Sequence, residues 1–318
     1  MKTFRFCKPS PIRLGFLPLT DCAPLVVAHE LGFAARYGLD LRLSREGSWA
    51  AVRDKIAYGA LECSQMLAGL TLALHLGVQG VKVDIAVPMA LGQGGNAITL
   101  APWLVADMWA ADPEIMAGPR ALRNRALAQV ITRRRKAGEP PLRLAMVFPF
   151  SSHNYELRYW LAAAGVNPDR DVVLSVVPPP RMVESMTTGE ICGFCVGEPW
   201  NQMAVALGVG EIVVTKHDLW PACPEKVLGM RADWLAENPE TAHALVATLM
   251  DAGRWADVPG HREELAHILS QPAYVGVEAE LLATSLRGTP HLNQATVANI
   301  PHYHLFHNHL AQFPWLSQ

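Results

Sequence analysis

The sequence predicts an α/β protein made of two lobes, each built on a mostly parallel β-sheet, with a cleft between them. The 318 residues are half hydrophobic and 18% charged, which fits two lobes of one globular protein better than a single small core. Apolar runs of strand length alternate with helical segments in the first third of the chain, and the same alternation begins again after residue 141.

The first alternation runs from residue 12 to about residue 89. The apolar run 12–17 has the length of a buried strand, and Thr20 and Asp21 can cap the helix that follows. Ser48 can cap a second helix, which begins at Trp49. The other limits follow from the periodicity and from glycines at helix ends: we expect strands at 12–17, 39–43, 61–66 and 81–89, and helices over 20–37, over 49–59 and up to about 76.

The second alternation follows a helical segment at about 101–142, whose basic end, Arg133 to Lys136, is typical of a solvated helix terminus. We expect strands at 142–148, 172–177, 191–196 and 212–215, helices over 151–164, 178–189 and 200–207, and only helices from about 232 onward. The chain would cross between lobes near residues 97 and 197. The expected domains are a first lobe at 1–97, a second lobe at 98–196, and a return to the first lobe at 197–318.

Composition argues against several classes of protein. The net charge of -2 and the pI near 6.6 give no reason to expect nucleic-acid binding, and no apolar stretch is long enough to span a bilayer. Residues 1–11 lack the apolar core of a secretory signal. The six cysteines lack the spacing of a disulfide framework, and Cys192 and Cys195 would face opposite sides of a strand. We therefore expect a cytoplasmic protein, unless an export segment precedes this chain.

No catalytic or cofactor motif is present. The glycine-rich turn 92–96 lacks the lysine of a phosphate loop and the spacing of a dinucleotide fingerprint. Ser151, Ser152 and His153 are adjacent on a helix and therefore do not face one another as a nucleophile and its base. The histidines at 302, 304, 307 and 309 have no neighbouring cysteine or carboxylate, so they do not indicate a metal site. We expect no enzymatic activity, no cofactor and no metal.

Two side chains stand where a ligand would bind in a fold of this class. Trp49 and His153 each follow a predicted strand and open a predicted helix, one in each lobe. Helix N-termini present unpaired N–H groups and partial positive charge, so both positions favour an anion. Each residue taken alone is also compatible with a purely structural role, as a core aromatic or a capping histidine.

Several strings resemble the nitrate- and bicarbonate-binding proteins of the NrtA/CmpA type. They are GFLPLTDCAPL at 15–25, GNAITL at 95–100, FPFSSHNYE at 148–156, VPPP at 177–180 and GFCVGEPWN at 193–201. The resemblance runs from about residue 12 to residue 316. It implies a bilobed fold of the type II periplasmic-binding-protein kind with two hinge crossings, and cytoplasmic nitrate/nitrite sensors of the NasS type are the expected nearest group.

The resemblance also implies which residues bind the ligand. The expected ligand-binding residues are Trp49, Gln65, Asn96, His153, Pro179, Val196, Gly197, Glu198 and Lys226. Lys226 lies in a string that resembles the family's W-x-x-H-P-E-K, with Cys223 where histidine is usual, and Lys216 is a secondary candidate. Bicarbonate binders resemble this pattern with a carboxylate at the Lys226 position, so lysine favours nitrate or nitrite. We expect Glu198 to pair with a cation or with backbone N–H groups.

The function expected from this resemblance is a cytoplasmic nitrate/nitrite sensor in which anion binding closes the cleft. Its partner would be an RNA-binding antiterminator of the ANTAR (NasT-like) type, so the chain itself would not contact nucleic acid or insert in a membrane. The alternative is the substrate-binding component of an ABC importer for nitrate, nitrite or bicarbonate. An enzyme of the related thiamine-pyrimidine synthesis group is disfavoured because its cysteine-rich signature is absent.

Overall fold

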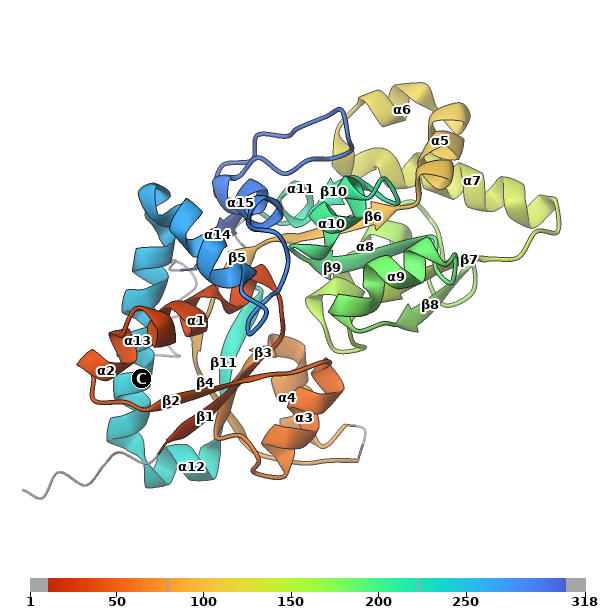
Figure 1. Cartoon of the computed structure of the whole chain (residues 1–318). Coiled ribbons are helices and arrows are strands. Elements are labelled where there is room, and N and C mark those ends of the chain that lie inside the picture. Colours follow the sequence, from red (N-terminus) through yellow and green to blue (C-terminus); the bar gives the residue numbers. More distant parts are fainter. Residues whose placement is uncertain (1–10, 79, 222, 307–318) are drawn as a thin grey trace, which may run out of the picture.

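The computed structural model describes residues 11–78, 80–221 and 223–306 and confirms the predicted two-lobed α/β architecture. Each lobe is built on a five-stranded sheet, and a short two-stranded sheet lies where the chain first passes between the lobes (Figure 1). We expected a cytoplasmic location because residues 1–11 lack the apolar core of a secretory signal. Residues 1–10 lie outside the described residues, as do His307 and His309 of the histidine cluster.

The first lobe has the strand order β2-β1-β3-β11-β4. Strands β1, β2 and β3 are parallel, as predicted, whereas β11 runs antiparallel between β3 and β4. The strands are β1 (Ile12–Phe16), β2 (Leu41–Arg45), β3 (Cys63–Leu67), β4 (Ile85–Ala90) and β11 (Lys226–Arg231). No strand was predicted at β11, because its apolar run is short and follows a proline-rich loop.

The second lobe repeats this arrangement with the order β8-β7-β9-β6-β10. Strands β7, β8 and β9 are parallel, and β6 runs antiparallel between β9 and β10. The strands are β6 (Asn96–Leu100), β7 (Leu142–Met146), β8 (Val172–Val176), β9 (Gly193–Gly197) and β10 (Glu211–Thr215). In both lobes the antiparallel strand is the first one formed after the chain has crossed over from the other lobe.

The expected domain boundary at residue 197 is wrong. Strand β10 pairs with β6, so the chain stays in the second lobe until Thr215. The return crossing lies between Thr215 and Lys226, after the short helix α11 (Lys216–Leu219). The physical reason is that β9 ends in the middle of the second sheet, and β10 is needed to cover the free edge of β6.

Helices cover both sheets. In the first lobe they are α1 (Ala23–Glu30), α2 (Phe33–Arg36), α3 (Trp49–Ala57), α4 (Ala68–Leu76), α12 (Ala232–Glu237), α13 (Pro239–Asp257), α14 (Arg262–Ser270) and α15 (Ala279–Arg287). In the second lobe they are α5 (Pro102–Ala111), α6 (Pro113–Ala117), α7 (Asn124–Lys136), α8 (Ser152–Ala162), α9 (Met182–Thr187), α10 (Trp200–Ala206) and α11. The 3₁₀ turns are η1 (Thr20–Cys22), η2 (Arg120–Arg123), η3 (Pro179–Arg181) and η4 (Pro259–His261).

The two lobes are packed against each other in this structure. One apolar cluster combines Trp49 and Leu70 of the first lobe with Phe148 and Phe194 of the second. Gly69, at the start of α4, lies so close to the carbonyl of Phe150 that a Cβ there would be 2.5 Å from the oxygen. The structure therefore describes a closed arrangement, in which polar groups facing the interface are buried.

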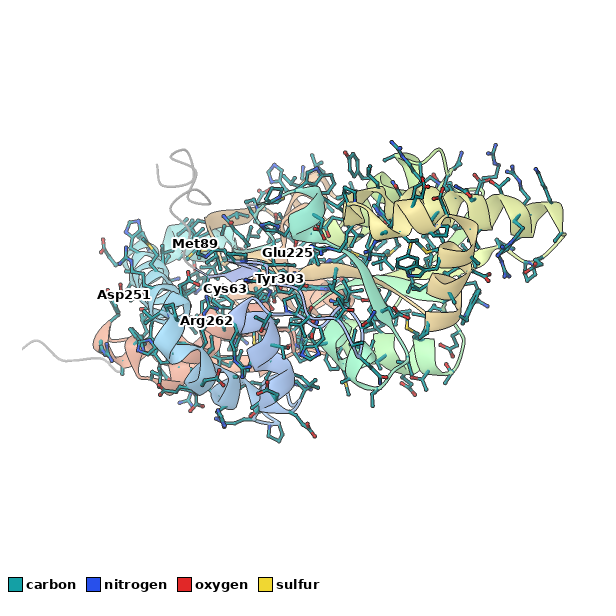
Figure 2. The ribbon with its side chains drawn as sticks, turned by 90° about the horizontal axis from the view of Figure 1, so that it is seen from above. Cys63, Met89, Glu225, Asp251, Arg262 and Tyr303 are labelled. Carbon is teal, nitrogen blue, oxygen red and sulfur yellow. The ribbon has the colours of Figure 1, made fainter. Side chains whose placement is uncertain are left out.

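A C-terminal segment, residues 288–306, crosses the junction between the lobes. Its strand β12 (His304–Leu305) pairs with β5 (Gln93–Gly94), and Gly95 N–H donates to the Tyr303 carbonyl over 2.8 Å. Tyr303 and Glu225 lie near the middle of the molecule when it is viewed from above (Figure 2). The glycine-rich turn that was predicted to lead out of the first lobe is thus held by residues 303–305 of the C-terminal segment.

We predict that Gly95→Ala destabilises the fold much more than Gly138→Ala. Both glycines have positive φ values, 75° and 70°, so both substitutions introduce backbone strain. A Cβ at Gly95 would also overlap the buried ring of His304, whereas nothing lies within 4 Å of one at Gly138. Urea unfolding should show a loss larger by roughly 2 kcal/mol for Gly95→Ala. Equal losses would contradict the described packing of His304.

Candidate functional site

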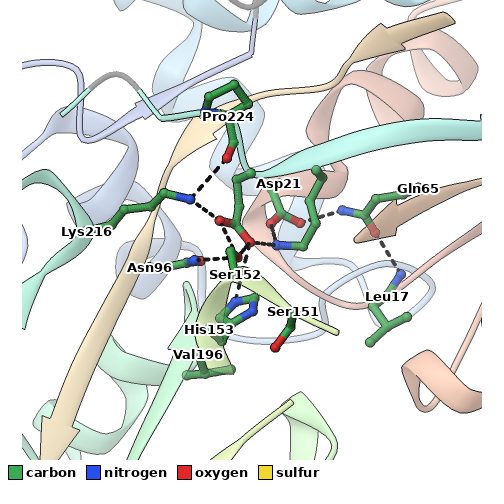
Figure 3. A network of polar contacts seen from close by, with 12 residues as sticks. Leu17, Asp21, Gln65, Asn96, Ser151, Ser152, His153, Val196, Lys216 and Pro224 are labelled. Carbon is green, nitrogen blue, oxygen red and sulfur yellow. Dashed lines mark hydrogen bonds and ion pairs between the residues drawn. The ribbon is translucent and has the colours of Figure 1, made fainter. Parts of the chain in front are cut away.

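Buried polar and charged side chains gather between the two lobes (Figure 3). The first lobe contributes residues from η1, β3 and β11 together with Glu225, which directly precedes β11, and the second contributes residues from β6, α8 and α11. The members are Asp21, Gln65, Asn96, Ser152, His153, Glu156, Lys216, Glu225 and Lys226, all less than 9% exposed except Ser152. We call this set the interlobe network.

Gln65, in the middle of β3, is fixed by two hydrogen bonds. Its side-chain oxygen accepts from Leu17 N–H over 3.0 Å, and its amide nitrogen donates to Asp21. These two bonds settle which way the amide points, so its N–H groups face Asp21 and the network. Gln65 therefore lies in the interlobe network, where it orients Asp21, and its expected contact with the ligand stays a prediction.

Lys226 is fully buried at the start of β11. Its ammonium nitrogen lies 2.8 Å from Asp21 Oδ2 and 2.7 Å from Glu225 Oε1. The same nitrogen lies 5.7 Å from the centre of the Trp49 ring, within the range of a cation–π contact. An ammonium has three N–H groups, and two of them are used by these carboxylates of the described residues. The third is available to a ligand.

Lys216 is already saturated by partners. Its ammonium nitrogen donates to Glu225, lies 3.1 Å from Glu156 Oε1, and donates to the Pro224 carbonyl over 3.2 Å. These neighbouring carboxylates outweigh burial and raise the pKa of Lys216. With all three donors occupied, Lys216 supports the network and is not placed to bind a ligand, which agrees with its secondary rank in the sequence analysis.

Glu225 connects the lobes. Besides the two lysines it accepts a hydrogen bond from Ser152 Oγ, which lies 2.6 Å from Oε1, and its Oε1 lies 3.7 Å from His153 Nε2. Burial alone would raise the pKa of this carboxyl, but the ammonium groups of Lys216 and Lys226 overcome burial and hold it well below its usual range. Glu225 therefore stays ionised and forms the centre of the ion-pair network.

Trp49 begins α3, as predicted, and His153 is the second residue of α8, one position later than predicted, on the opposite side of the interface. Ser48 Oγ caps α3 by accepting from Ala51 N–H, and Ser151 Oγ caps α8 by accepting from Asn154 N–H. Trp49 Nε1 and both ring nitrogens of His153 are buried and have no hydrogen-bond partner among the described residues. Buried donors without partners are costly, so these are places where a ligand would complete the site.

His153 is neutral in this arrangement. Burial lowers the pKa of its imidazole to about 3, an effect opposed by Glu225 and reinforced by Lys226 and Lys216. Asn96 lies beside it on β6, where its amide nitrogen is 3.3 Å from Glu156 Oε1 and its oxygen has no partner among the described residues. Burial raises the pKa of the Glu156 carboxyl.

Val196 and Gly197 end β9 beside the network. The Val196 carbonyl accepts from Asn201, and Gly197 pairs with Asn96 across the sheet. A Cβ at Gly197 would lie 3.4 Å from Asn96 Oδ1 and 3.7 Å from Asp21 Oδ2, so the glycine leaves space among polar atoms. Pro179 is buried at the start of η3 and supplies no side-chain donor to the network.

Glu198 points away from the interlobe network toward the C-terminal segment. Its carboxylate accepts from Gln202 N–H over 3.1 Å and from Tyr303 O–H over 2.9 Å. The expected pairing with a backbone N–H is confirmed, and no ion pair with a cation is formed among the described residues. Burial raises the pKa of Glu198 to about 7. Its contacts are those of a residue that ties the chain crossing to Tyr303.

The acidic half of the network was not predicted to belong to the site; it consists of Asp21, Glu156 and Glu225. A usable signal was present, because each is a carboxylate inside or next to a string that carries the resemblance. Cys195 also contacts the network, with its sulfur 3.7 Å from Glu156, and the five described cysteines are free. Within the described ranges no group of three His, Cys, Asp or Glu side chains could hold a metal ion.

Comparison with known proteins places the chain in a family. The model of the NMT1-like family matches residues 7–270. The chain belongs to that family. A crystal structure of the periplasmic nitrate-binding protein NrtA from Synechocystis PCC 6803 superimposes with a TM-score of 0.87 at 30% identity, covering 97% of this chain and 78% of that one. The resemblance to the NrtA/CmpA type and the bilobed periplasmic-binding-protein fold are thereby confirmed.

Two curated relatives match most of this chain. The nitrate/nitrite binding protein NrtA of Nostoc sp. is 34% identical over 281 residues, 87% of this chain and 60% of NrtA. The nitrate import ATP-binding protein NrtC of Synechocystis sp. is 42% identical over 275 residues, 85% of this chain but 38% of NrtC. This chain thus spans between about two and three fifths of these relatives, and the expected special closeness to NasS stays a prediction.

The names of the NrtA relatives describe binding proteins, which agrees with the expectation that the chain binds a ligand and is not an enzyme. Among the described helices, none is long and apolar enough to cross a membrane.

We predict that Glu198→Gln changes the pH dependence of stability. The pKa of Glu198 rises from an ordinary 4.5 to about 7 on folding, so the folded chain binds the extra proton between these values. The stabilisation that results is present below pH 4.5 and lost as pH rises through 7. The unfolding free energy of the variant relative to wild type should therefore increase by on the order of 2 kcal/mol from pH 5 to pH 8. A constant difference would contradict the buried position of this carboxyl.

Proposed function

We propose that this chain binds one small planar anion, nitrate or nitrite, between its lobes. The observation that carries the proposal is the set of unused donors around one place: the indole N–H of Trp49, the imidazole of His153 and the third N–H of Lys226. Nitrate and nitrite only accept hydrogen bonds, so a site made of donors suits them. Helix N-termini on both sides, at α3 and α8, favour the same charge.

The proposed site takes its donors from both lobes, so the anion would hold the lobes together. Trp49 and Lys226 belong to the first lobe, and His153, Asn96 and the backbone of Gly197 belong to the second. Gln65 orients Asp21, which in turn orients Lys226. Lysine at position 226 supports nitrate or nitrite over bicarbonate, which carries an O–H and would be better matched by an acceptor at that place.

The comparisons support the importer role over the sensor role. The relatives named above are a periplasmic nitrate-binding protein, a nitrate/nitrite binding protein and a nitrate import ATP-binding protein, and none of these three is named as a sensor. We therefore propose that the chain is a substrate-binding component of an ABC importer, which would work outside the cytoplasm as the periplasmic NrtA does. The cytoplasmic sensor with a NasT-like antiterminator as its partner is the second candidate, and it rests on the sequence resemblance alone.

We predict that Trp49→Phe weakens nitrate binding roughly 10- to 100-fold, because a hydrogen bond to a charged partner contributes about 1.5–3 kcal/mol. Phenylalanine keeps the ring and removes the indole N–H. The matched control is Trp103→Phe, since Trp103 is 49% exposed on α5 and away from the network. Isothermal titration calorimetry measures both. A Trp49→Phe chain with wild-type nitrate affinity would contradict the role of this donor.

We further predict that Lys226→Gln abolishes measurable nitrate binding, because the variant loses the only ammonium with an N–H left unused by the described residues of the network. Lys82→Gln, at an exposed position, is the control. Circular dichroism of both variants separates loss of binding from loss of folding. Nitrate binding by a folded Lys226→Gln chain would refute the assignment of this residue.

The two cellular roles differ in their partners. Pull-down of this chain with an importer's membrane complex, and separately with an ANTAR-type antiterminator, each with and without nitrate, distinguishes them. The importer role predicts capture of the complex, whereas nitrate-dependent release of the antiterminator would favour the sensor.

A further inference from the structure

The interlobe network contains more negative than positive charge. Three carboxylates, Asp21, Glu156 and Glu225, face two ammonium groups, Lys216 and Lys226, and all five side chains are buried. Every carboxylate in the set lies within 3.1 Å of an ammonium nitrogen. Both lysines are therefore neutralised before any ligand arrives, and the network as a whole carries one excess negative charge when all five groups are ionised.

An anion added to such a network meets an electrostatic cost. The site lies in the closed interface, where water does not screen the charges and an uncompensated one is expensive. Two routes would offset the cost: a cation enters with the anion, or a group of the network takes up a proton. Within the described residues no group of His, Cys, Asp and Glu side chains is arranged to hold a metal ion, so the chain itself supports the second route.

His153 is the group best placed to take up the proton. Neither of its ring nitrogens has a hydrogen-bond partner among the described residues. Burial raises the pKa of the Asp21 and Glu156 carboxyls, but both of these, like Glu225, are already held by ammonium groups. A neutral imidazole carries one N–H and one lone pair, and that lone pair repels an acceptor. The imidazolium carries two N–H groups, so protonation turns the ring entirely into a donor.

The charged groups that face His153 determine when it can be protonated. Glu225 lies 3.7 Å from Nε2 and favours the imidazolium, whereas Lys226 and Lys216 oppose it. Glu156 is one helical turn away on α8, within the same network. Without a ligand, burial and the lysines dominate and the ring is neutral. An anion beside the ring adds the negative charge that reverses this balance.

We propose that the site binds its anion together with one proton, and that His153 receives this proton. The inference rests on the proposed anion-binding function and adds a second ligand, the proton, to it. It predicts that binding becomes weaker as pH rises, by up to tenfold per pH unit, because each bound anion needs one proton from solution.

Calorimetric titration of the full chain with nitrate at pH 7.5, in buffers of different ionisation enthalpy, counts the protons directly. The proposal predicts a slope of one proton taken up per nitrate bound, and an affinity that falls between pH 6.5 and pH 8.5. Nitrate binding with a slope of zero would overturn this inference and leave the proposed function intact. Absence of nitrate binding in every buffer would overturn the proposed function itself.

Two variants test which residue takes up the proton. His153→Asn keeps an N–H donor but does not titrate, so the variant should bind nitrate with no proton uptake and no pH dependence. Glu198→Gln should keep the full uptake, because Glu198 faces Gln202 and Tyr303 and not the network. Uptake that persists in His153→Asn, or disappears in Glu198→Gln, would overturn the assignment to His153.

A spectroscopic measurement covers the case in which His153→Asn folds but binds too weakly to titrate. Nitrogen-15 NMR of wild-type chain with labelled histidine should show one imidazole changing to imidazolium shifts when nitrate is added at pH 7.5. The signal that changes should be the one missing from the spectrum of His153→Asn. No change in that signal on saturation with nitrate would overturn the proposal.

Discussion

The carboxylate of Glu225 is the group on which the closed arrangement depends. It bonds to Lys216 of the second lobe and to Lys226 of the first, and it accepts from Ser152 at the start of α8. Removal of this one charge would leave two buried ammonium groups with fewer partners, a far larger cost than loss of a surface ion pair. Glu225 and Asp21 together set the position of the Lys226 ammonium group that we assign to the anion, and the bond from Glu225 to Lys216 joins this arrangement to the second lobe.

Each lobe supplies donors from the first turn of a helix and from the start of its antiparallel strand. Each lobe has a capped helix that begins just beyond a parallel strand, α3 in the first and α8 in the second, and each has one antiparallel strand placed directly after a crossing. Trp49 is the first residue of α3 and His153 is the second residue of α8, while Lys226 and Asn96 begin the two antiparallel strands. In the closed arrangement these four positions lie between the lobes. Ligands of open α/β sheets bind in the comparable place, beyond the carboxyl ends of the parallel strands.

Short sequence patterns predicted the helix caps and the parallel strands, because these features depend on residues that are close together in the chain. The caps at Ser48 and Ser151 and the parallel strands follow from short-range periodicity and hydrogen bonding. The pairing of β10 with β6 and the insertion of β11 did not follow, since both depend on contacts between residues more than 100 positions apart. Asp21 and Glu225 were not predicted as site residues for the same reason. The sequence does not show whether a carboxylate is buried, and the cation that pairs with both of them, Lys226, is identified only by the folded structure.

The central claim is that one planar anion binds among Trp49, His153 and Lys226, and a crystal structure of the chain grown with nitrate tests it most directly. We expect planar electron density for nitrate within hydrogen-bond distance of Trp49 Nε1, a His153 ring nitrogen and Lys226 Nζ. Glu225 should still be bonded to Lys216. A closed interface in which these donors bind only water at saturating nitrate, or nitrate bound elsewhere, would contradict it.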